Sequence, residues 1–253
     1  MTNTVKAFLI LLATLIIPAS SIASTPQAVT LKPSNTLTLF GVVDENMVEA
    51  VARKLPNLTS STVHVQILSP GGSILSGKRI IDQLLGLQLQ GKKVHCVAHI
   101  AVSMAFVIFQ SPACQTRQVV SGAMLMQHQA SVGIEGPINN LISNVHAVLL
   151  EIEELEKMQA ARMHITLEAF REAIANDMWL NSGSAALRAN AADSQIVVIC
   201  STELLAAKGK QEEINLGRVK ILVNYSDCPY IMQPKVEILP VDTNKKNFIR
   251  IHY

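Results

Sequence analysis

Apolar and polar residues follow one another in short, regular runs over residues 37–127, and each run has the period of a strand or a helix. Val63, Val65 and Ile67 alternate with polar neighbours, as residues of a half-buried strand do. Apolar residues between positions 74 and 88 instead recur at helical spacing. The predicted strands are 37–43, 63–67, 94–98, 118–120 and 124–127, and the predicted helices are 45–55, 74–88 and 103–109. This alternation predicts an α/β domain around a buried sheet.

A longer amphipathic helix is predicted over residues 137–161. Apolar residues from Ile138 to Leu155 follow the i, i+3, i+4, i+7 pattern, while Glu151 and Lys157 fall on the opposite face. Such an apolar stripe has to be covered, either by the helix's own domain or by another subunit.

Residues 196–253 are expected to form a small α+β extension appended to the main domain, which spans 24–195. Before it, Thr166 is a candidate N-cap for a helix that ends near Ala175. The extension should begin with an apolar strand and continue with a helix and two further strands. The predicted helix is 203–213, and the predicted strands are 219–223 and 236–241.

The first 23 residues are expected to be a signal peptide rather than part of the fold. Lys6 precedes an apolar run, 7–17, that is shorter than the about 20 residues needed to cross a bilayer but suits a secretory signal. Ser21 and Ala23 are small residues at the two positions that a signal peptidase reads, so cleavage is expected after about Ala23. We therefore expect a periplasmic or secreted protein that meets the membrane only during export. An uncleaved N-terminal membrane anchor is the alternative.

The composition excludes some classes of protein without indicating a function. Hydrophobic residues make up 49% of the 253 residues, which excludes a disordered chain. A formal net charge of +2 gives no electrostatic reason to expect a nucleic-acid partner.

The four cysteines all follow the expected signal peptide. An even number in an oxidising compartment predicts two disulfides, and pairing each cysteine with its neighbour in sequence joins Cys96 to Cys114 and Cys200 to Cys228. Four buried free thiols are the alternative. No CxxC pair occurs, so neither a zinc ribbon nor a thioredoxin-like site is indicated.

Three short segments could carry chemistry. Gly71 and Gly72 lie between a predicted strand and a predicted helix, where their amides could face a developing negative charge. Ser103 is a lone hydroxyl among apolar residues at the start of a short helix, and His128 directly follows an apolar strand. Each also has a plain alternative. The glycines could form an ordinary turn, Ser103 could be a small buried serine, and His128 could be a surface or core histidine without a catalytic role.

A metal site is not expected. His95 and His99 lie on one face of a predicted strand, but no third ligand follows at a suitable spacing.

The order of these segments resembles the Clp protease proteolytic subunit family. Pro-Gly-Gly is followed by Ser103, by the Met-x-His sequence ending at His128, by a long helix, and by Asp177 just before the stretch 179–182. The resemblance covers residues 35–195. It implies the Clp/crotonase-type fold, a spiral of β-β-α units, with the long helix 137–161 as the interface of a homo-oligomer. A related family with this fold, signal peptide peptidase A, typically uses a serine–lysine pair instead.

The resemblance also implies the roles of individual residues. Ser103 would be the nucleophile, His128 its general base, and Asp177 the group that orients the imidazole. The backbone amides of Gly72 and Met104 would form the oxyanion hole. The set needs neither a cofactor nor a metal.

The function expected from these features is an exported, ATP-independent serine endopeptidase that cleaves peptides or unfolded protein segments. The family usually has glycines at the positions of His99 and Ala105. Together with the extension 196–253, this departure motivates the alternative of a catalytically inactive protein that keeps the fold for binding or assembly. An acyl-CoA enzyme of the crotonase superfamily is disfavoured, because export removes the coenzyme and the Ser/His/Asp set would have no purpose.

Overall fold

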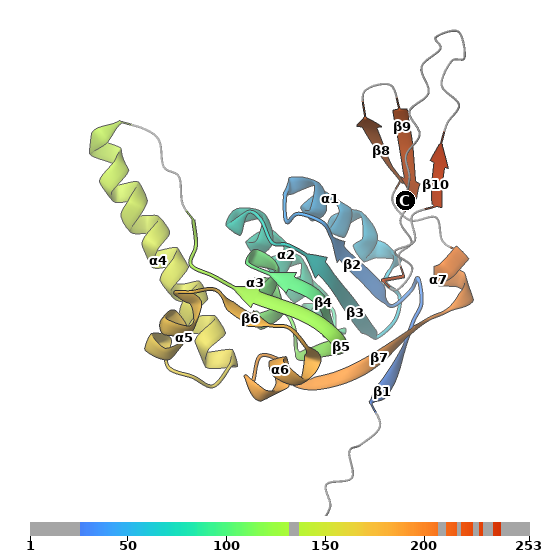
Figure 1. Ribbon diagram of the computed structural model, residues 1–253, viewed down its shortest axis with the longest axis horizontal. Coiled ribbons are helices and arrows are strands. Elements are labelled where there is room, and N and C mark those ends of the chain that lie inside the picture. Colours follow the sequence, from blue (N-terminus) through green and yellow to red (C-terminus); the bar gives the residue numbers. More distant parts are fainter. Residues whose placement is uncertain are drawn as a thin grey trace, which may run out of the picture.

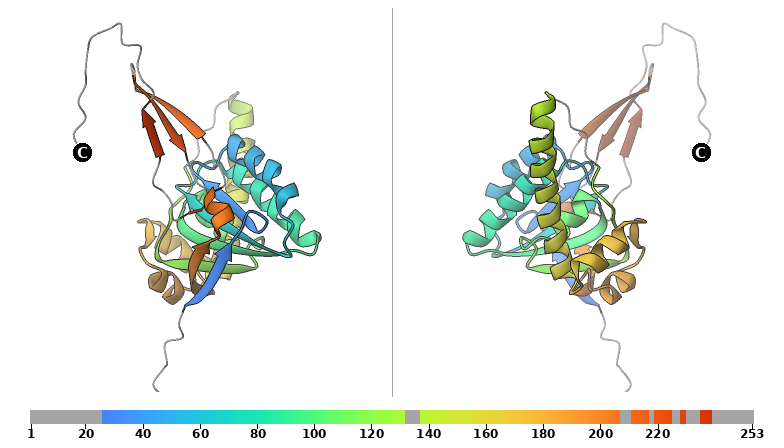
Figure 2. Two further views of the ribbon diagram at one scale, coloured as in Figure 1. Left: turned by 90° about the vertical axis from the view of Figure 1, so that its right-hand side faces the viewer. Right: turned by 90° about the vertical axis from the view of Figure 1, so that its left-hand side faces the viewer.

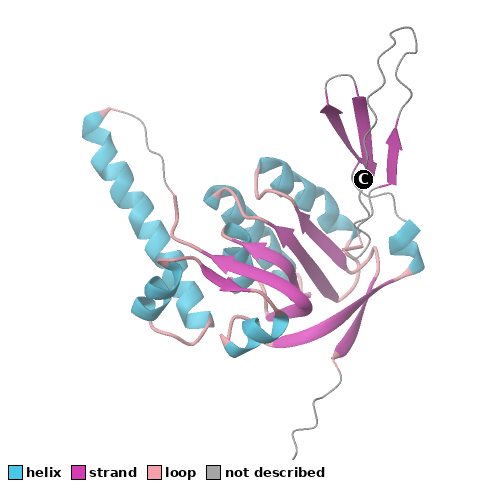
Figure 3. Cartoon of the chain, viewed as in Figure 1, coloured by secondary structure: helices cyan, strands magenta, loops and turns pink. Residues whose placement is uncertain are grey.

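The computed structural model describes residues 26–131, 137–206, 211–216, 219–224, 228–229 and 235–238. The expected signal peptide and its cleavage position lie outside these residues. Helices and strands alternate over the main part of the chain (Figure 3), as the hydrophobic pattern predicts. No helix in the described part of the chain is long and apolar enough to cross a bilayer.

A mainly parallel seven-stranded sheet forms the centre of the molecule, with the order β1-β7-β5-β4-β3-β2 (Figure 1). Every neighbouring pair along this path is parallel, and only β6 pairs antiparallel, with β5. The strands are β1 Gln27–Leu31, β2 Thr36–Phe40, β3 Thr62–Ser69, β4 Lys93–Val102, β5 Thr116–Gln127, β6 Met178–Leu180 and β7 Ser194–Cys200. This arrangement confirms the predicted α/β class and is that of a Clp-like fold.

Three helices lie together beside β2, β3 and β4 (Figures 1 and 2) and pack against these strands and against one another. They are α1 Glu45–Lys54, α2 Ile74–Leu89 and α3 Met104–Gln110, and a short 3-10 turn, η1 Leu55–Asn57, follows α1. Asp44 caps α1 by accepting from the Met47 amide at 2.9 Å. The side chain of Ser73 caps α2 by accepting from the Ser76 amide at 3.3 Å. All seven residues of α3 are buried, which explains why its sequence is almost wholly apolar.

The long helix α4, Ile138–Arg162, confirms the helix predicted over 137–161, but its apolar stripe is only partly covered. Near its C-terminal end, α4 packs against α3 and against α5, Leu167–Ile174. Thr166 caps α5 as predicted, accepting from the Ala169 amide at 3.1 Å. Further toward the N-terminus of α4, Ile142 and Leu149 are 77% and 57% exposed.

The main sheet extends further along the chain than expected. The predicted boundary between residues 195 and 196 falls inside β7, which pairs with β1 over its last five residues, Ile196–Cys200. The extension therefore begins after Cys200. Between β6 and β7 lies the short helix α6, Gly183–Arg188.

Beyond Cys200 the predicted helix over 203–213 is wrong in its second half. Helix α7 covers only Thr202–Ala206, and Gln211–Leu216 forms strand β8 instead. β8 pairs antiparallel with β9, Val219–Asn224, which pairs in turn with β10, Lys235–Ile238. Ile214 and Leu216 alternate with polar residues here, so the segment suits a half-buried strand at least as well as a helix.

Both predicted disulfides are confirmed. Cys96 of β4 is bonded to Cys114, with 5.3 Å between the Cα atoms, and both residues are fully buried. Cys200, the last residue of β7, is bonded to Cys228 in the extension, with a Cα–Cα distance of 6.0 Å.

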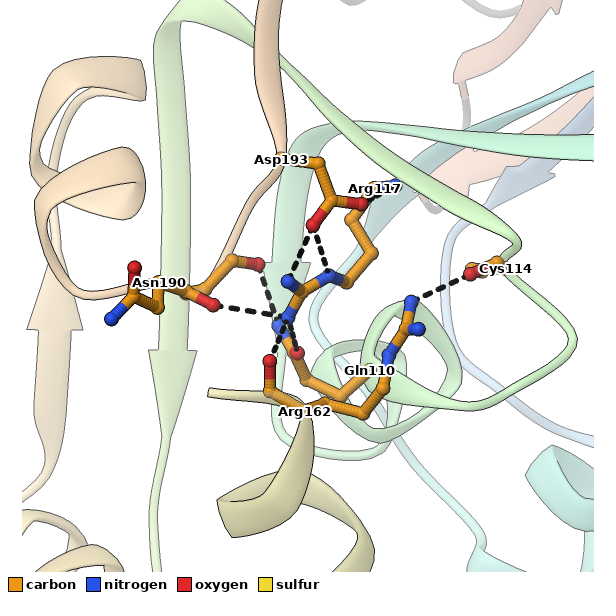
Figure 4. Close-up of polar contacts among 7 residues, drawn as sticks. Gln110, Cys114, Arg117, Arg162, Asn190 and Asp193 are labelled. Atoms are coloured by element: carbon orange, nitrogen blue, oxygen red, sulfur yellow. Dashed lines mark hydrogen bonds and ion pairs between the residues drawn. The ribbon is translucent and has the colours of Figure 1, made fainter. Parts of the chain in front are cut away.

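A cluster of polar contacts around the buried Arg117 of β5 joins distant parts of the chain (Figure 4). The Arg117 guanidinium donates to the Asp193 carboxylate from Nε at 3.1 Å and from Nη2 at 2.5 Å. Its Nη1 donates to the Gln110 side chain at 2.6 Å and to the carbonyls of Arg162 and Asn190 at 2.9 and 3.0 Å. These bonds fix the end of α3, the end of α4 and the start of β7 to one point of the sheet.

Candidate active site

Ser103 occupies a strained turn between β4 and α3. Its φ of 56° and ψ of −123° are unfavourable for a residue with a Cβ atom, and such strain tends to occur at functional sites. The turn is fixed on both sides: the Ser103 amide donates to the Met126 carbonyl at 2.9 Å, and the Ser103 carbonyl accepts from the Phe106 amide at 2.9 Å. The serine is thus held at the carboxyl end of β4, directly before the helix.

The glycine pair predicted to lie near a reacting group does lie against Ser103. Gly71 has a φ of 92°, and a Cβ atom placed on it would be 2.5 Å from the Val102 carbonyl oxygen and 2.6 Å from Ser103 Cβ. Gly72 is held next to Val43, because the Val43 amide donates to the Gly71 carbonyl at 2.8 Å and the Val43 carbonyl accepts from the Ser73 amide at 2.8 Å. Glycine is therefore needed here both for its backbone conformation and for the close approach of two backbone segments.

Replacing Gly71 by alanine should slow acylation of Ser103 at least tenfold and lower the free energy of unfolding, because the new methyl group would push the Ser103 turn out of place. Titration with a covalent serine reagent and urea unfolding measure the two effects. Gly91→Ala is the matched control, since Gly91 also has positive φ (80°) but has nothing within 4 Å of an added Cβ. Equal acylation rates in the two variants would show that the crowding at Gly71 has no influence on the site.

The structure brings the predicted base to the predicted nucleophile. His128 directly follows β5, the neighbour of β4, and its Nε2 atom lies 2.8 Å from Ser103 Oγ. This is hydrogen-bond distance for a base that accepts a hydroxyl proton. The two residues come together because the carboxyl ends of adjacent parallel strands meet at the same edge of the sheet.

Asp177 is not joined to this pair. It lies just beyond the last residue pair of the β5–β6 ladder, Gln127 with Met178, so it is close to His128 in the fold. Its carboxylate is exposed, however, and within the described residues no hydrogen bond links it to His128. Asp177 has a φ of 56°, a left-handed conformation, in the connection between α5 and β6.

Two backbone amides beside the serine have the freedom that an oxyanion hole requires. Met104 is the first residue of α3, and the first amides of a helix have no partner within it. In the described part of the chain, neither this amide nor that of Gly72 donates a hydrogen bond to the protein. Both residues line the pocket that contains Ser103 and His128.

This pocket is mostly apolar. Its volume is about 160 Å³, close to that of a cavity that holds one benzene molecule. Helix α4 supplies one wall with Ile152, Leu155, Glu156 and Gln159, and Ile74, Met104, Val107 and Ile174 supply further apolar surface. Among the described lining residues Glu156 is the only one with a carboxylate, and it accepts from Arg171 Nε at 2.7 Å.

The two positions at which the family usually has glycine do not line this pocket. Burial lowers the pKa of His99 to about 4, so the side chain is neutral near pH 7, and its Nε2 lies 2.8 Å from Gln66 Oε1. Ala105 is buried within α3. Neither His99 nor Ala105 therefore borders the described pocket at Ser103. Among the described residues, no group of three or more metal-ligating side chains is arranged to hold a metal ion.

A parallel α/β sheet with a serine in a strained strand-to-helix turn, a histidine in hydrogen-bond contact with it and two free amides nearby is the arrangement expected of an α/β serine hydrolase. The model of the Clp protease family matches residues 25–190, well over half of the sequence, and the chain belongs to this family. It is similar to the ATP-dependent Clp protease proteolytic subunit 2 of Pseudomonas aeruginosa, with 28% identity over 149 residues that cover 57% of this chain and 73% of that protein. The predicted family is confirmed, and membership supports a serine peptidase function.

The sequence singled out Ser103, His128 and the glycine turn, which the fold brings together, but it did not single out two polar residues of the pocket. Gln127 and Gln159 were counted only as members of a strand and a helix. The one available signal was a glutamine at each place where the surrounding pattern calls for an apolar residue.

Proposed function

We propose that this protein is an exported serine endopeptidase that cleaves peptides or unfolded protein segments without ATP, with Ser103 as nucleophile and His128 as general base. The 2.8 Å hydrogen bond between Ser103 Oγ and His128 Nε2 is the observation that carries the proposal. A serine hydroxyl is a weak nucleophile until a base removes its proton, and this contact supplies the base.

The geometry supports a two-step acyl transfer. Ser103 Oγ attacks the carbonyl carbon of the scissile peptide bond while its proton passes to His128 Nε2, and the resulting oxyanion accepts hydrogen bonds from the Gly72 and Met104 amides. His128 then gives this proton to the leaving amine as the C–N bond breaks. In the second step His128 takes a proton from water, the hydroxide attacks the ester, and the proton returns to Ser103.

The third catalytic role is that of a carboxylate that supports the imidazole of the base. We assign it to Asp177, which would act only through its charge. An aspartate bonded to the imidazole fixes its tautomer, and replacing such an aspartate by asparagine lowers kcat by about 10⁴. Because Asp177 makes no such bond, its charge is expected to stabilise the imidazolium weakly across solvent.

The test is labelling of the mature protein with a fluorophosphonate, followed by mass spectrometry of the adduct. We expect one equivalent of label on Ser103, no detectable label in His128→Ala, and less than a tenfold loss of labelling rate in Asp177→Asn. His164→Ala, at a histidine outside the pocket, is the matched control and should label at the rate of the unchanged protein.

The outcomes separate the parts of the proposal. Well-folded protein that takes up no label on Ser103 would overturn the peptidase and favour an inactive binding or assembly protein. A loss of about 10⁴ in Asp177→Asn would show instead that its carboxylate bonds to His128 in the reacting enzyme.

The pocket supports a preference for an apolar side chain next to the cleaved bond. Its walls are mostly aliphatic, and its volume of about 160 Å³ suits a side chain up to the size of a benzene ring. Cleavage of a denatured protein followed by sequencing of the new termini tests this, and cuts mainly after Asp or Glu would contradict it.

Export is supported by the apolar segment 7–17 and by two disulfides, which persist in oxidising compartments. Sequencing the N-terminus of the protein from fractionated cells should give Ser24 in the periplasmic or secreted fraction. A chain that keeps Lys6 and stays with the membrane would support the anchored alternative.

A homo-oligomer formed through α4 is supported by the exposed apolar side chains of that helix, Ile142, Val145, Leu149 and Leu150. Such an assembly is compatible with membership in the Clp protease family. Light scattering after gel filtration should give a mass of several chains, reduced in Leu149→Lys. A monomer at micromolar concentration would contradict the proposal.

A further inference from the structure

Two buried glutamines connect the segment that carries His128 to the long helix α4. Gln127 is the last residue of β5, directly before His128, and it is 6% exposed. Gln159 lies near the C-terminal end of α4 and is 1% exposed. Both line the pocket that contains Ser103 and His128.

Their amides form a continuous chain of hydrogen bonds between the two elements. Gln127 Nε2 donates to Gln159 Oε1 at 2.6 Å, and Gln159 Nε2 donates to the Leu155 carbonyl of α4 at 2.9 Å. At the other end, Gln127 Oε1 accepts from the His128 backbone amide at 3.3 Å. Each side-chain amide thus has both its donor and its acceptor engaged.

The backbone of His128 needs this chain because the sheet no longer holds it. The β4–β5 ladder ends at Met126 and the β5–β6 ladder ends at Gln127, so His128 is the first residue of this segment outside both ladders. Within the described residues, the His128 backbone amide donates its hydrogen bond to Gln127 Oε1. The position of the imidazole relative to Ser103 therefore depends on where the Gln127 side chain is held.

Burial makes the arrangement specific. A buried amide without partners is costly, so the two glutamines are stable only when α4 and the end of β5 are placed to satisfy both. A pair of apolar side chains could fill the same space, but it would lack the directional hydrogen bonds that fix α4 relative to the end of β5. The polar pair thus defines one relative placement of the α4 wall and the base.

Resting on the proposed function of Ser103 and His128, we propose that Gln127 and Gln159 are positioning residues. They transmit the placement of α4 to His128 and keep Nε2 within hydrogen-bond distance of Ser103 Oγ. Through them, packing on α4 influences the rate of acylation.

The experiment compares Gln127→Met, Gln159→Met and the double variant, because methionine has nearly the shape of glutamine without its polar groups. Fluorophosphonate labelling gives the maximal acylation rate and the half-saturating concentration of the reagent, and urea unfolding gives stability. We expect each single variant to have a lower urea midpoint, since it leaves the other amide unsatisfied. The double variant should regain most of that midpoint.

The acylation rate should behave differently from stability. In the double variant the maximal rate should stay at least tenfold below that of the unchanged protein, with a similar half-saturating concentration, because the base is no longer held in place. Gln118→Met is the matched control: Gln118 is buried in the same strand, lies outside this pocket, and should label normally.

The failures are distinguishable. If the unchanged protein takes up no label on Ser103, the proposed function fails. If the unchanged protein and the stable double variant acylate at the same maximal rate, the peptidase stands and the positioning role is wrong. A single variant that does not fold leaves the double variant to decide.

Discussion

Replacing Ser103 by glycine is expected to abolish acylation and, at the same time, to stabilise the folded protein by about 1 kcal/mol. The hydroxyl is the proposed nucleophile, and Ser131, the other serine that lines the described pocket, has no histidine in hydrogen-bond contact to activate it. The stability gain follows from the backbone: a non-glycine residue at a φ of 56° and a ψ of −123° costs about 1–3 kcal/mol, and glycine avoids this cost. Part of the gain is offset by the greater freedom of glycine in the unfolded chain.

Ser103→Ala separates the two effects, because alanine removes the hydroxyl but keeps the Cβ atom. Both variants should lose the label, and only the glycine variant should have a higher urea midpoint. A glycine variant no more stable than the alanine variant would show that the turn at Ser103 is not strained.

Replacing Arg117 by methionine is expected to lower the free energy of unfolding by about 3 kcal/mol or more. Arg117 is 3% exposed and its guanidinium satisfies the Asp193 carboxylate, a side-chain amide and two carbonyls, so its loss leaves one buried and three partly buried acceptors without this donor. Urea unfolding measures the effect. Arg53→Met is the matched control, because the Arg53–Glu49 pair is exposed and contributes less than about 1 kcal/mol.

Arg117→Met should also change how the free energy of unfolding depends on pH in acid. Burial by itself would raise the pKa of Asp193, but its hydrogen bonds to Arg117 and the charge of that residue outweigh burial and hold the pKa below its ordinary value. The ion pair therefore stabilises the fold above about pH 4, where the aspartate of the unfolded chain is ionised, and the contribution is lost as the pH falls through the depressed folded value. The urea midpoint of Arg117→Met should fall less steeply between about pH 5 and pH 2. Parallel curves for the two proteins would contradict this assignment.

The sequence predicted those parts of the fold that local patterns determine. The helices that became α1, α2, α4 and α5 have clear periodicity or an N-cap, and the strands β2 to β5 have apolar runs between breaks. Ser103, His128 and the glycine turn could be singled out because each lies at the end of a predicted strand, and because their order along the chain resembles that of the Clp protease proteolytic subunit family. The disulfide pairs were found because few pairings were possible.

The missing parts depend on contacts between distant residues. Strand β1 exists because it pairs with β7, far along the chain, and three-residue β6 exists because it pairs with β5. Arg117 has the sequence neighbourhood of any exposed arginine, and only the assembled fold brings Asp193 to it. The position of the Asp177 carboxylate likewise depends on the conformation of a turn, which spacing along the chain does not determine.

Because the disulfide between Cys96 and Cys114 is buried, its oxidation state is expected to reflect the conditions under which the protein folded. Both residues are fully buried in the core, so a thiol reductant reaches the sulfurs only when that part of the structure opens. A chain that folds with the bond closed will therefore keep it after transfer to a reducing solution. A chain that folds with both thiols reduced is equally shielded from later oxidants. The oxidation state of this one pair, measured on protein taken directly from its source, reports the redox conditions during folding rather than those of the sample tube.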